Sequence, residues 1–147
     1  MINEIIVESQ KVLLRPYSNP QIDMEEIISE LLNYIEENNL TSKNPLFGRN
    51  YLNDDNQMIF EFGIDILEDI ETEYPFVSLE IPKQKVLSII HKGPFDNISD
   101  SINKLELFID ENGLELMDIP RYIYHDKPEI TKERDLITEI QFPIEII

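Results

Sequence analysis

The chain carries an internal repeat, and this feature restricts its possible folds more than any other. When the sequence is shifted by 74 residues, eleven of the 31 positions from residue 10 to residue 40 are identical in the second half. Chance would give roughly two identities at ordinary composition. We therefore predict a single domain over residues 1–147, made of two repeats at about residues 1–70 and 75–147. In the first copy the identical positions are residues 10–13, Pro20, Ile28, Leu31, Ile35, residues 37–38 and Leu40.

Each repeat contains the pattern of an amphipathic helix. Apolar residues at steps of three and four form one stripe along residues 23–38, and the same steps recur along residues 98–109. Asp23 is suited to the N-cap of the first helix. Gly113 follows the second helix and Asn39 follows the first, and both residue types favour the left-handed conformation that ends a helix. The agreement of stripe and cap in both copies supports the repeat.

Strand-like segments surround each predicted helix, one before it and two after it. Two strand–helix–strand–strand units side by side predict an α+β fold with one largely antiparallel sheet. We expect both helices on one face of this sheet and a concave ligand cleft on the other. The expected strands are residues 5–15, 46–52 and 58–66 in the first copy, and residues 76–90 (broken near Pro82), 121–126 and 135–144 in the second.

Charge and residue usage exclude several classes of protein. Thirty acidic against twelve basic residues give a formal net charge of −18, so we expect no direct binding to nucleic acid, which requires a basic face. No apolar run approaches the ~18 residues of a membrane span, and we expect a cytoplasmic protein. Cysteine is absent and the two histidines are His91 and His125. We therefore expect no metal site and no cofactor.

Two glutamates lie on strand faces that do not belong to the predicted core. Alternation along residues 58–66 and 136–144 sets Glu61 and Glu139 on the side opposite the large apolar residues. A pocket for an amphipathic or cationic small molecule and a plain aromatic cover of the sheet fit this pattern equally. We predict that Ile123 faces the helices and that the preceding strands bring further side chains to the face of the glutamates: Phe47, Arg49, Tyr51, Tyr122 and Tyr124.

The order of four motifs in the second half resembles the GyrI-like effector-binding domain. These motifs are HKGPF at residues 91–95, a helix that ends in ENG at 111–113, PRYIY at 120–124 and LITEIQFPI at 136–144. This family includes the ligand domains of AraC-type and MerR-type drug-responsive regulators and stand-alone gyrase-inhibitor-like proteins. Its fold is a duplicated strand–helix–strand–strand unit, so the resemblance covers essentially the whole chain.

The resemblance implies a cleft that binds hydrophobic, often cationic compounds. The family's glutamate of the final strand matches Glu139, and its pocket tyrosine matches Tyr124. The remaining predicted ligand-binding residues carry over more weakly, and they are Tyr122, Phe47, Tyr51, Glu61 and Arg49. Regulators of this family carry a helix-turn-helix ahead of the domain, and we expect none in this chain because the first repeat begins almost at Met1.

Arg49 complicates the expected ligand charge, because a cation on the cleft face would pair with Glu61 or Glu139. Three functions therefore stay open. The favoured one is a small-molecule effector- or drug-binding protein. The second is a hydrolase of cyclopropane-containing natural products, with Glu139 positioning or deprotonating water and Tyr124 orienting the substrate. The third is an interaction with a protein partner such as gyrase or a regulator.

Overall fold

The two repeats form the same order of elements. The structure is a computed structural model that describes residues 1–19, 21–126 and 132–147. In these residues the chain forms eight β-strands and two α-helices, and the strand pairings within each unit are antiparallel. The chain divides into two compact units, one of Gln10–Ile81 and one of Met1–Ser9 with Pro82–Ile147. The prediction of an α+β fold with antiparallel strands is confirmed.

The unit Gln10–Ile81 is a four-stranded sheet with one helix, and its strands lie in the order β3-β4-β2-β5. Arg15 of β2 binds Glu30 of the helix through Nε and Oε2 at 2.7 Å. Residues that share the face of Arg15 therefore face the helix, and Phe62, its cross-strand partner, is one of them. The elements are β2 (Gln10–Tyr17), α1 (Met24–Glu37), β3 (Phe47–Leu52), β4 (Met58–Asp65) and β5 (Val77–Ile81).

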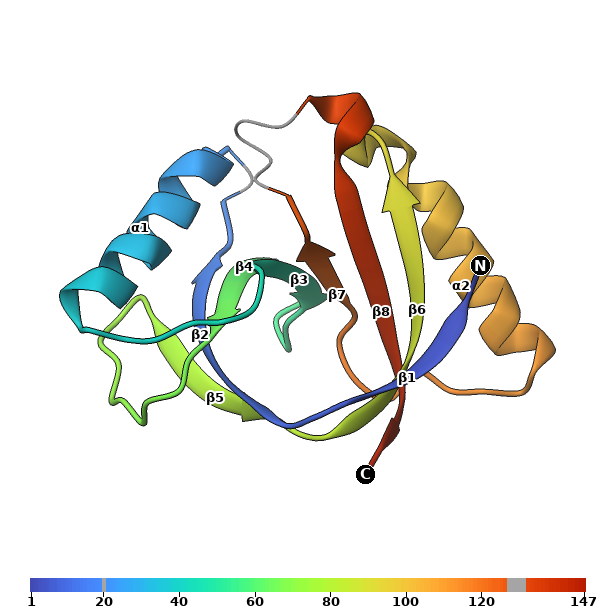
Figure 1. Cartoon of the computed structure of the whole chain (residues 1–147), viewed down its shortest axis with the longest axis horizontal. Coiled ribbons are helices and arrows are strands. Elements are labelled where there is room, and N and C mark those ends of the chain that lie inside the picture. Colours follow the sequence, from blue (N-terminus) through green and yellow to red (C-terminus); the bar gives the residue numbers. More distant parts are fainter. Residues whose placement is uncertain (20, 127–131) are drawn as a thin grey trace. The chain divides into compact units, whose positions relative to one another are not determined.

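The second unit repeats this plan with strands in the order β1-β6-β8-β7 and α2 against one face (Figure 1). Its elements are β1 (Asn3–Val7), β6 (Gln84–Lys92), α2 (Ile98–Glu111), β7 (Arg121–Tyr124) and β8 (Ile137–Ile146), with short 3-10 helices at Phe95–Asn97 and Glu133–Asp135. A buried core joins the helix to the two central strands. It consists of Leu87, Ile89, Leu105, Ile140 and Phe142.

The first strand of each repeat pairs with the second strand of the other repeat. β1 pairs with β6, and β5 pairs with β2. At the 74-residue offset, β1 corresponds to β5 and α1 corresponds to α2, residue for residue. The predicted single strand over residues 5–15 is therefore wrong, because the chain breaks at Glu8 and Ser9 and enters another unit. Alternation along the sequence does not reveal such an exchange, because both strands carry the same period.

Both helices end as the sequence predicts. The Asp23 carboxylate accepts a hydrogen bond from the backbone of Glu25 at 3.0 Å and caps α1. Asn39 and Gly113 have positive φ values of 54° and 63°. The next residue in each copy donates its N–H to the carbonyl five positions back, from Leu40 to Ile35 at 2.9 Å and from Leu114 to Ile109 at 3.0 Å. This is the Schellman motif, formed twice at equivalent positions.

Leu105 offers a test of the helix packing. Its side chain is fully buried in α2, so Leu105→Ala should lower the free energy of unfolding by about 2–5 kcal/mol. Leu107, two residues further along α2, is 58% exposed, and Leu107→Ala is the matched control, with an expected change of about 0.5 kcal/mol or less. Urea unfolding followed by circular dichroism measures both. Equal midpoints for the two variants would contradict this packing.

Candidate functional site

Glu139 lies in the middle of β8 on the face turned away from α2. Its neighbour Ile140 belongs to the core beside the helix, and successive strand residues point to opposite faces. In the register, Glu139 lies between Ile90 of β6 and Ile123 of β7. Its side chain is 15% exposed. The strand pairing therefore sets one carboxylate between two aliphatic side chains, close to the surface.

Three polar side chains contact the Glu139 carboxylate. One oxygen, Oε2, accepts hydrogen bonds from Ser88 Oγ at 2.7 Å and from Gln141 Nε2 at 2.8 Å. The other oxygen, Oε1, lies 2.9 Å from Nε2 of His125. Ser88 and Gln141 are cross-strand partners, so the register of β6 and β8 brings both to the face of the glutamate.

These contacts keep Glu139 ionised. Burial by itself would raise its pKa, because it disfavours the charged form. The hydrogen bonds from Gln141, Ser88 and His125, together with the charge of His125, outweigh burial and hold the pKa of Glu139 below its usual value. The site therefore presents a lasting negative charge at neutral pH.

Gln141 leaves one buried acceptor without a partner. Its Nε2 donates to Glu139, which fixes the orientation of the amide, since only the nitrogen donates. Its Oε1 is buried and has no hydrogen-bond partner within the described residues. Such an atom costs about 1–3 kcal/mol when unpaired. A buried acceptor beside a carboxylate is suited to a ligand that carries a hydrogen-bond donor.

The other unit carries an equivalent carboxylate in a different electrostatic state. Glu61 of β4 lies opposite Arg49 of β3, as Glu139 lies opposite Ile123, and Arg49 falls on Ile123 at the 74-residue offset. The Arg49 and Glu61 side chains form an ion pair and are only 8% and 3% exposed. The predicted pairing of Arg49 with a glutamate is thus found at Glu61. Arg49 neutralises the charge of that carboxylate. The residue of β7 that corresponds to Arg49 is the aliphatic Ile123.

The prediction that Tyr122 and Tyr124 share a face with Glu139 is wrong. Tyr122 pairs with Ile140 and Tyr124 pairs with Thr138, so both tyrosines are on the α2 side of the sheet. Tyr122 packs against the core, and Tyr124 makes an edge-to-face contact with Phe95 at 5.6 Å between ring centroids. In the four-residue strand Arg121–Tyr124, side-chain polarity does not indicate which face packs against the helix.

The predicted aromatic residues of the other unit do share the face of its carboxylate. Phe47, Arg49 and Tyr51 alternate along β3, and the register sets them opposite Gly63, Glu61 and Ile59. Phe47 is buried. A Cβ at Gly63 would lie 2.5 Å from the Phe47 ring, so glycine is needed for the ring to lie across this strand. Burial, with a smaller effect from the charge of Glu61, raises the pKa of Tyr51.

Of the three partners of Glu139, Gln141 was placed on its face from the sequence, because it follows Glu139 by two residues. Ser88 is 51 residues from Glu139, and only the register of two distant strands joins them. His125 lies two residues after Ile123, and both face Glu139, whereas Ile123 was wrongly predicted to face the helices. The other histidine, His91, is buried on the α2 side with hydrogen bonds to Ser101 and to the Pro94 carbonyl.

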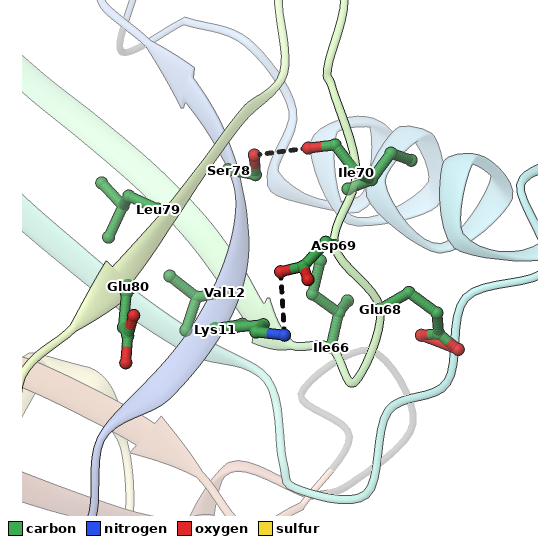
Figure 2. A pocket seen from close by; sticks show the side chains of 9 residues that line it. All are labelled: Lys11, Val12, Ile66, Glu68, Asp69, Ile70, Ser78, Leu79 and Glu80. Carbon is green, nitrogen blue, oxygen red and sulfur yellow. Dashed lines mark hydrogen bonds and ion pairs between the residues drawn. The ribbon is translucent and has the colours of Figure 1, made fainter.

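A small hollow of about 230 Å³ lies in the unit Gln10–Ile81 (Figure 2). Lys11 reaches across it to Asp69 at 2.8 Å, and Ser78 donates to the Ile70 carbonyl at 3.0 Å. Lys11, Asp69 and Ser78 are thus already engaged in contacts within the hollow. Among the described residues, no group of three or more His, Asp or Glu side chains is placed to hold a metal ion. Within the described residues, no helix is long and apolar enough to cross a membrane.

The chain matches the family model of the GyrI-like small molecule binding domain over residues 13–145. It is similar in structure to EcmrR in a complex with DNA, with a TM-score of 0.83, 22% identity and coverage of 100% of this chain and 58% of that chain. The chain thus spans little more than half the length of that protein. Against the crystallised EcmrR C-terminal domain the TM-score is 0.78, with 22% identity and coverage of 100% and 98%.

Two further solved structures share this fold. A hydrolase from Listeria innocua gives a TM-score of 0.69 at 15% identity and covers 98% of this chain and 91% of its own. The structure of SAV2435 bound to tetraphenylphosphonium gives 0.62 at 12% identity, with coverage of 99% and 94%. A search of curated proteins gives no match. Identities this low show the common fold alone.

The buried Arg49–Glu61 pair predicts a pH-dependent loss of stability. Arg49→Met leaves a buried carboxylate without its partner and should cost about 3–5 kcal/mol near pH 7.5. Burial raises the pKa of Glu61, so the folded protein takes up a proton more readily than the unfolded chain, and this contribution favours the fold at low pH. The loss should therefore shrink as the pH falls to about 5.

Urea unfolding of the wild type and Arg49→Met at both pH values measures this effect. The double variant Arg49→Met with Glu61→Gln is the control, because it removes the unpaired charge and should recover much of the stability at pH 7.5. A loss of the same size at both pH values in the single variant would show that Glu61 is not its source.

Proposed function

The chain belongs to the family of GyrI-like small-molecule binding domains, and we propose that it binds hydrophobic cations through Glu139. The observation that carries this proposal is the difference between the two equivalent carboxylates. Glu61 has a guanidinium as its cross-strand partner, whereas Glu139 has Ile123. The binding of a cation is therefore more favourable at Glu139 than at Glu61, because no arginine occupies the cross-strand position opposite Glu139.

The immediate surroundings of Glu139 suit an apolar cation. Ile90 and Ile123 flank the carboxylate on the adjacent strands, and Ile90 is 54% exposed. A hydrophobic cation would bury part of this aliphatic surface while its charge meets the carboxylate. A purely inorganic cation would gain only the second of these contributions.

The similarity to SAV2435 bound to tetraphenylphosphonium supports this class of ligand. In the same way, the similarity to EcmrR in its DNA complex supports a role in effector sensing. The net charge of −18 argues that this chain receives the ligand and does not itself contact DNA phosphates.

Binding is favoured over hydrolysis. The Listeria innocua hydrolase shares the fold, but a mechanism that uses Glu139 with Tyr124 requires the two side chains on one face of the sheet. The register sets them on opposite faces. Incubation with a strained-ring substrate and analysis of the products separates the two functions, and turnover that is lost in Glu139→Gln would overturn the preference for binding.

Tetraphenylphosphonium, whose charge is permanent, provides a direct test of the role of Glu139. Glu139→Gln should weaken its binding by about 1–3 kcal/mol, because the variant loses the Coulombic attraction between the carboxylate and a cation about 6 Å away. The binding of triphenylphosphine oxide, a neutral compound of related shape, should weaken much less in the same variant. Isothermal titration calorimetry at low ionic strength measures both ligands with both proteins.

Glu4→Gln is the matched control, because Glu4 is an exposed residue of the same unit and its substitution makes the same change in net charge. Its affinity for tetraphenylphosphonium should remain that of the wild type. An equal decrease in the two variants would assign the effect to the overall charge of the protein, and the Glu139 site would be rejected.

A further inference from the structure

The two oxygens of the Glu139 carboxylate differ in what holds them. Oε2 is held by Ser88 and Gln141, two neutral donors that are largely buried. Oε1 lies 2.9 Å from Nε2 of the His125 imidazole. The His125 side chain is 38% exposed, so it is the contact that a ligand approaching from solvent meets first.

The backbone and the ring of His125 are held separately. Its N–H donates to the Ile137 carbonyl at 3.1 Å, which keeps the main chain beside β8. The ring is attached only through rotatable bonds, so it is able to leave Oε1 without a change in the strand. An exposed side chain exchanges rotamers within nanoseconds, faster than a ligand dissociates.

We propose that His125 is an internal competitor that occupies the place of the ligand cation on Glu139 and thereby determines the specificity and pH dependence of binding. This inference rests on the proposed function, because it assumes that Glu139 receives the cation. In the free protein the imidazole contacts Oε1. In the complex the cation takes that position and the ring turns toward solvent.

Competition of this kind depends on the charge of the imidazole. Histidine is the side chain that ordinarily changes its charge between about pH 5 and 8. The protonated ring pairs with Glu139 and repels an incoming cation, so a cation binds after the ring has moved away or has released its proton to solvent. The neutral ring offers only a hydrogen bond and leaves the negative charge of Glu139 uncompensated.

Other charged groups also lie near Glu139. The pKa of Glu139 is held below its usual value, so the carboxylate stays ionised above pH 5. Lys92 and Arg121 lie on the same face, opposite Ile137 and Gln141. The carboxylate of Asp126 accepts the N–H of Ile137 at 2.8 Å. Lys92, Arg121 and Asp126 are common to the wild type and to both His125 variants described below, so any pH effect that arises from them persists in both variants.

The test measures the dissociation constant of tetraphenylphosphonium at pH 5.5 and 8.0 for the wild type and two variants. In the wild type, binding should be about fivefold weaker at pH 5.5, which corresponds to about 1 kcal/mol. His125→Gln keeps a neutral donor at both pH values and should bind tightly at both. His125→Lys keeps a cation at both and should bind weakly at both.

Calorimetry in buffers of different ionisation enthalpy gives an independent measurement. Near pH 6 the wild type should release a fraction of a proton on binding, and neither variant should release it. Thermal unfolding curves establish that all three proteins are folded. A purely structural role of His125 would weaken binding in both variants alike and would leave the pH dependence in place.

The outcomes separate this inference from the proposed function. If the wild type binds tetraphenylphosphonium no better than triphenylphosphine oxide, or if Glu139→Gln binds it equally well, the proposed function fails. If Glu139 is required but wild-type affinity is the same at pH 5.5 and 8.0, the inference alone fails. If the affinity of His125→Gln for tetraphenylphosphonium still depends on pH, the inference about His125 also fails.

Discussion

The antiparallel pairing of β6 with β8 determines both the core and the candidate site of its unit. This pairing sets Ile89 opposite Ile140 beneath α2 and, on the other face, Ser88 opposite Gln141 beside Glu139. If the register of β8 against β6 shifted by one residue, Glu139 would point into the core and Ile140 would point away from it, because side chains alternate along a strand. The free energy of burying the core therefore also holds the carboxylate and its hydrogen-bond donors in place.

The two units show how one scaffold supports two different electrostatic states. In one, Arg49 lies opposite Glu61 and both are buried, and the ion pair is internally complete. In the other, Ile123 lies opposite Glu139, and the compensating group is a titratable imidazole near the surface. A single difference at equivalent cross-strand positions separates a structural ion pair from a candidate binding group.

The sequence predicted the features that depend on local periodicity or on the repeat. The helix stripe, the Asp23 cap and the left-handed Asn39 and Gly113 were all predicted, because each is determined by residues within a few positions. The face of Tyr122 and Tyr124 was predicted wrongly, since it depends on the register of β7 against β8. Ser88 and His125 reach Glu139 only through tertiary pairing, and a single sequence does not report such contacts.

The exchange of first strands has a consequence for synthesis of the chain. β1 is made before its partner β6, which begins more than 70 residues later along the chain. Until residues 84–92 follow, β1 lacks the strand that supplies its backbone hydrogen bonds. Closure of so long a loop is entropically costly and slow. Pairing of β1 therefore waits until the whole first repeat and the start of the second have been made.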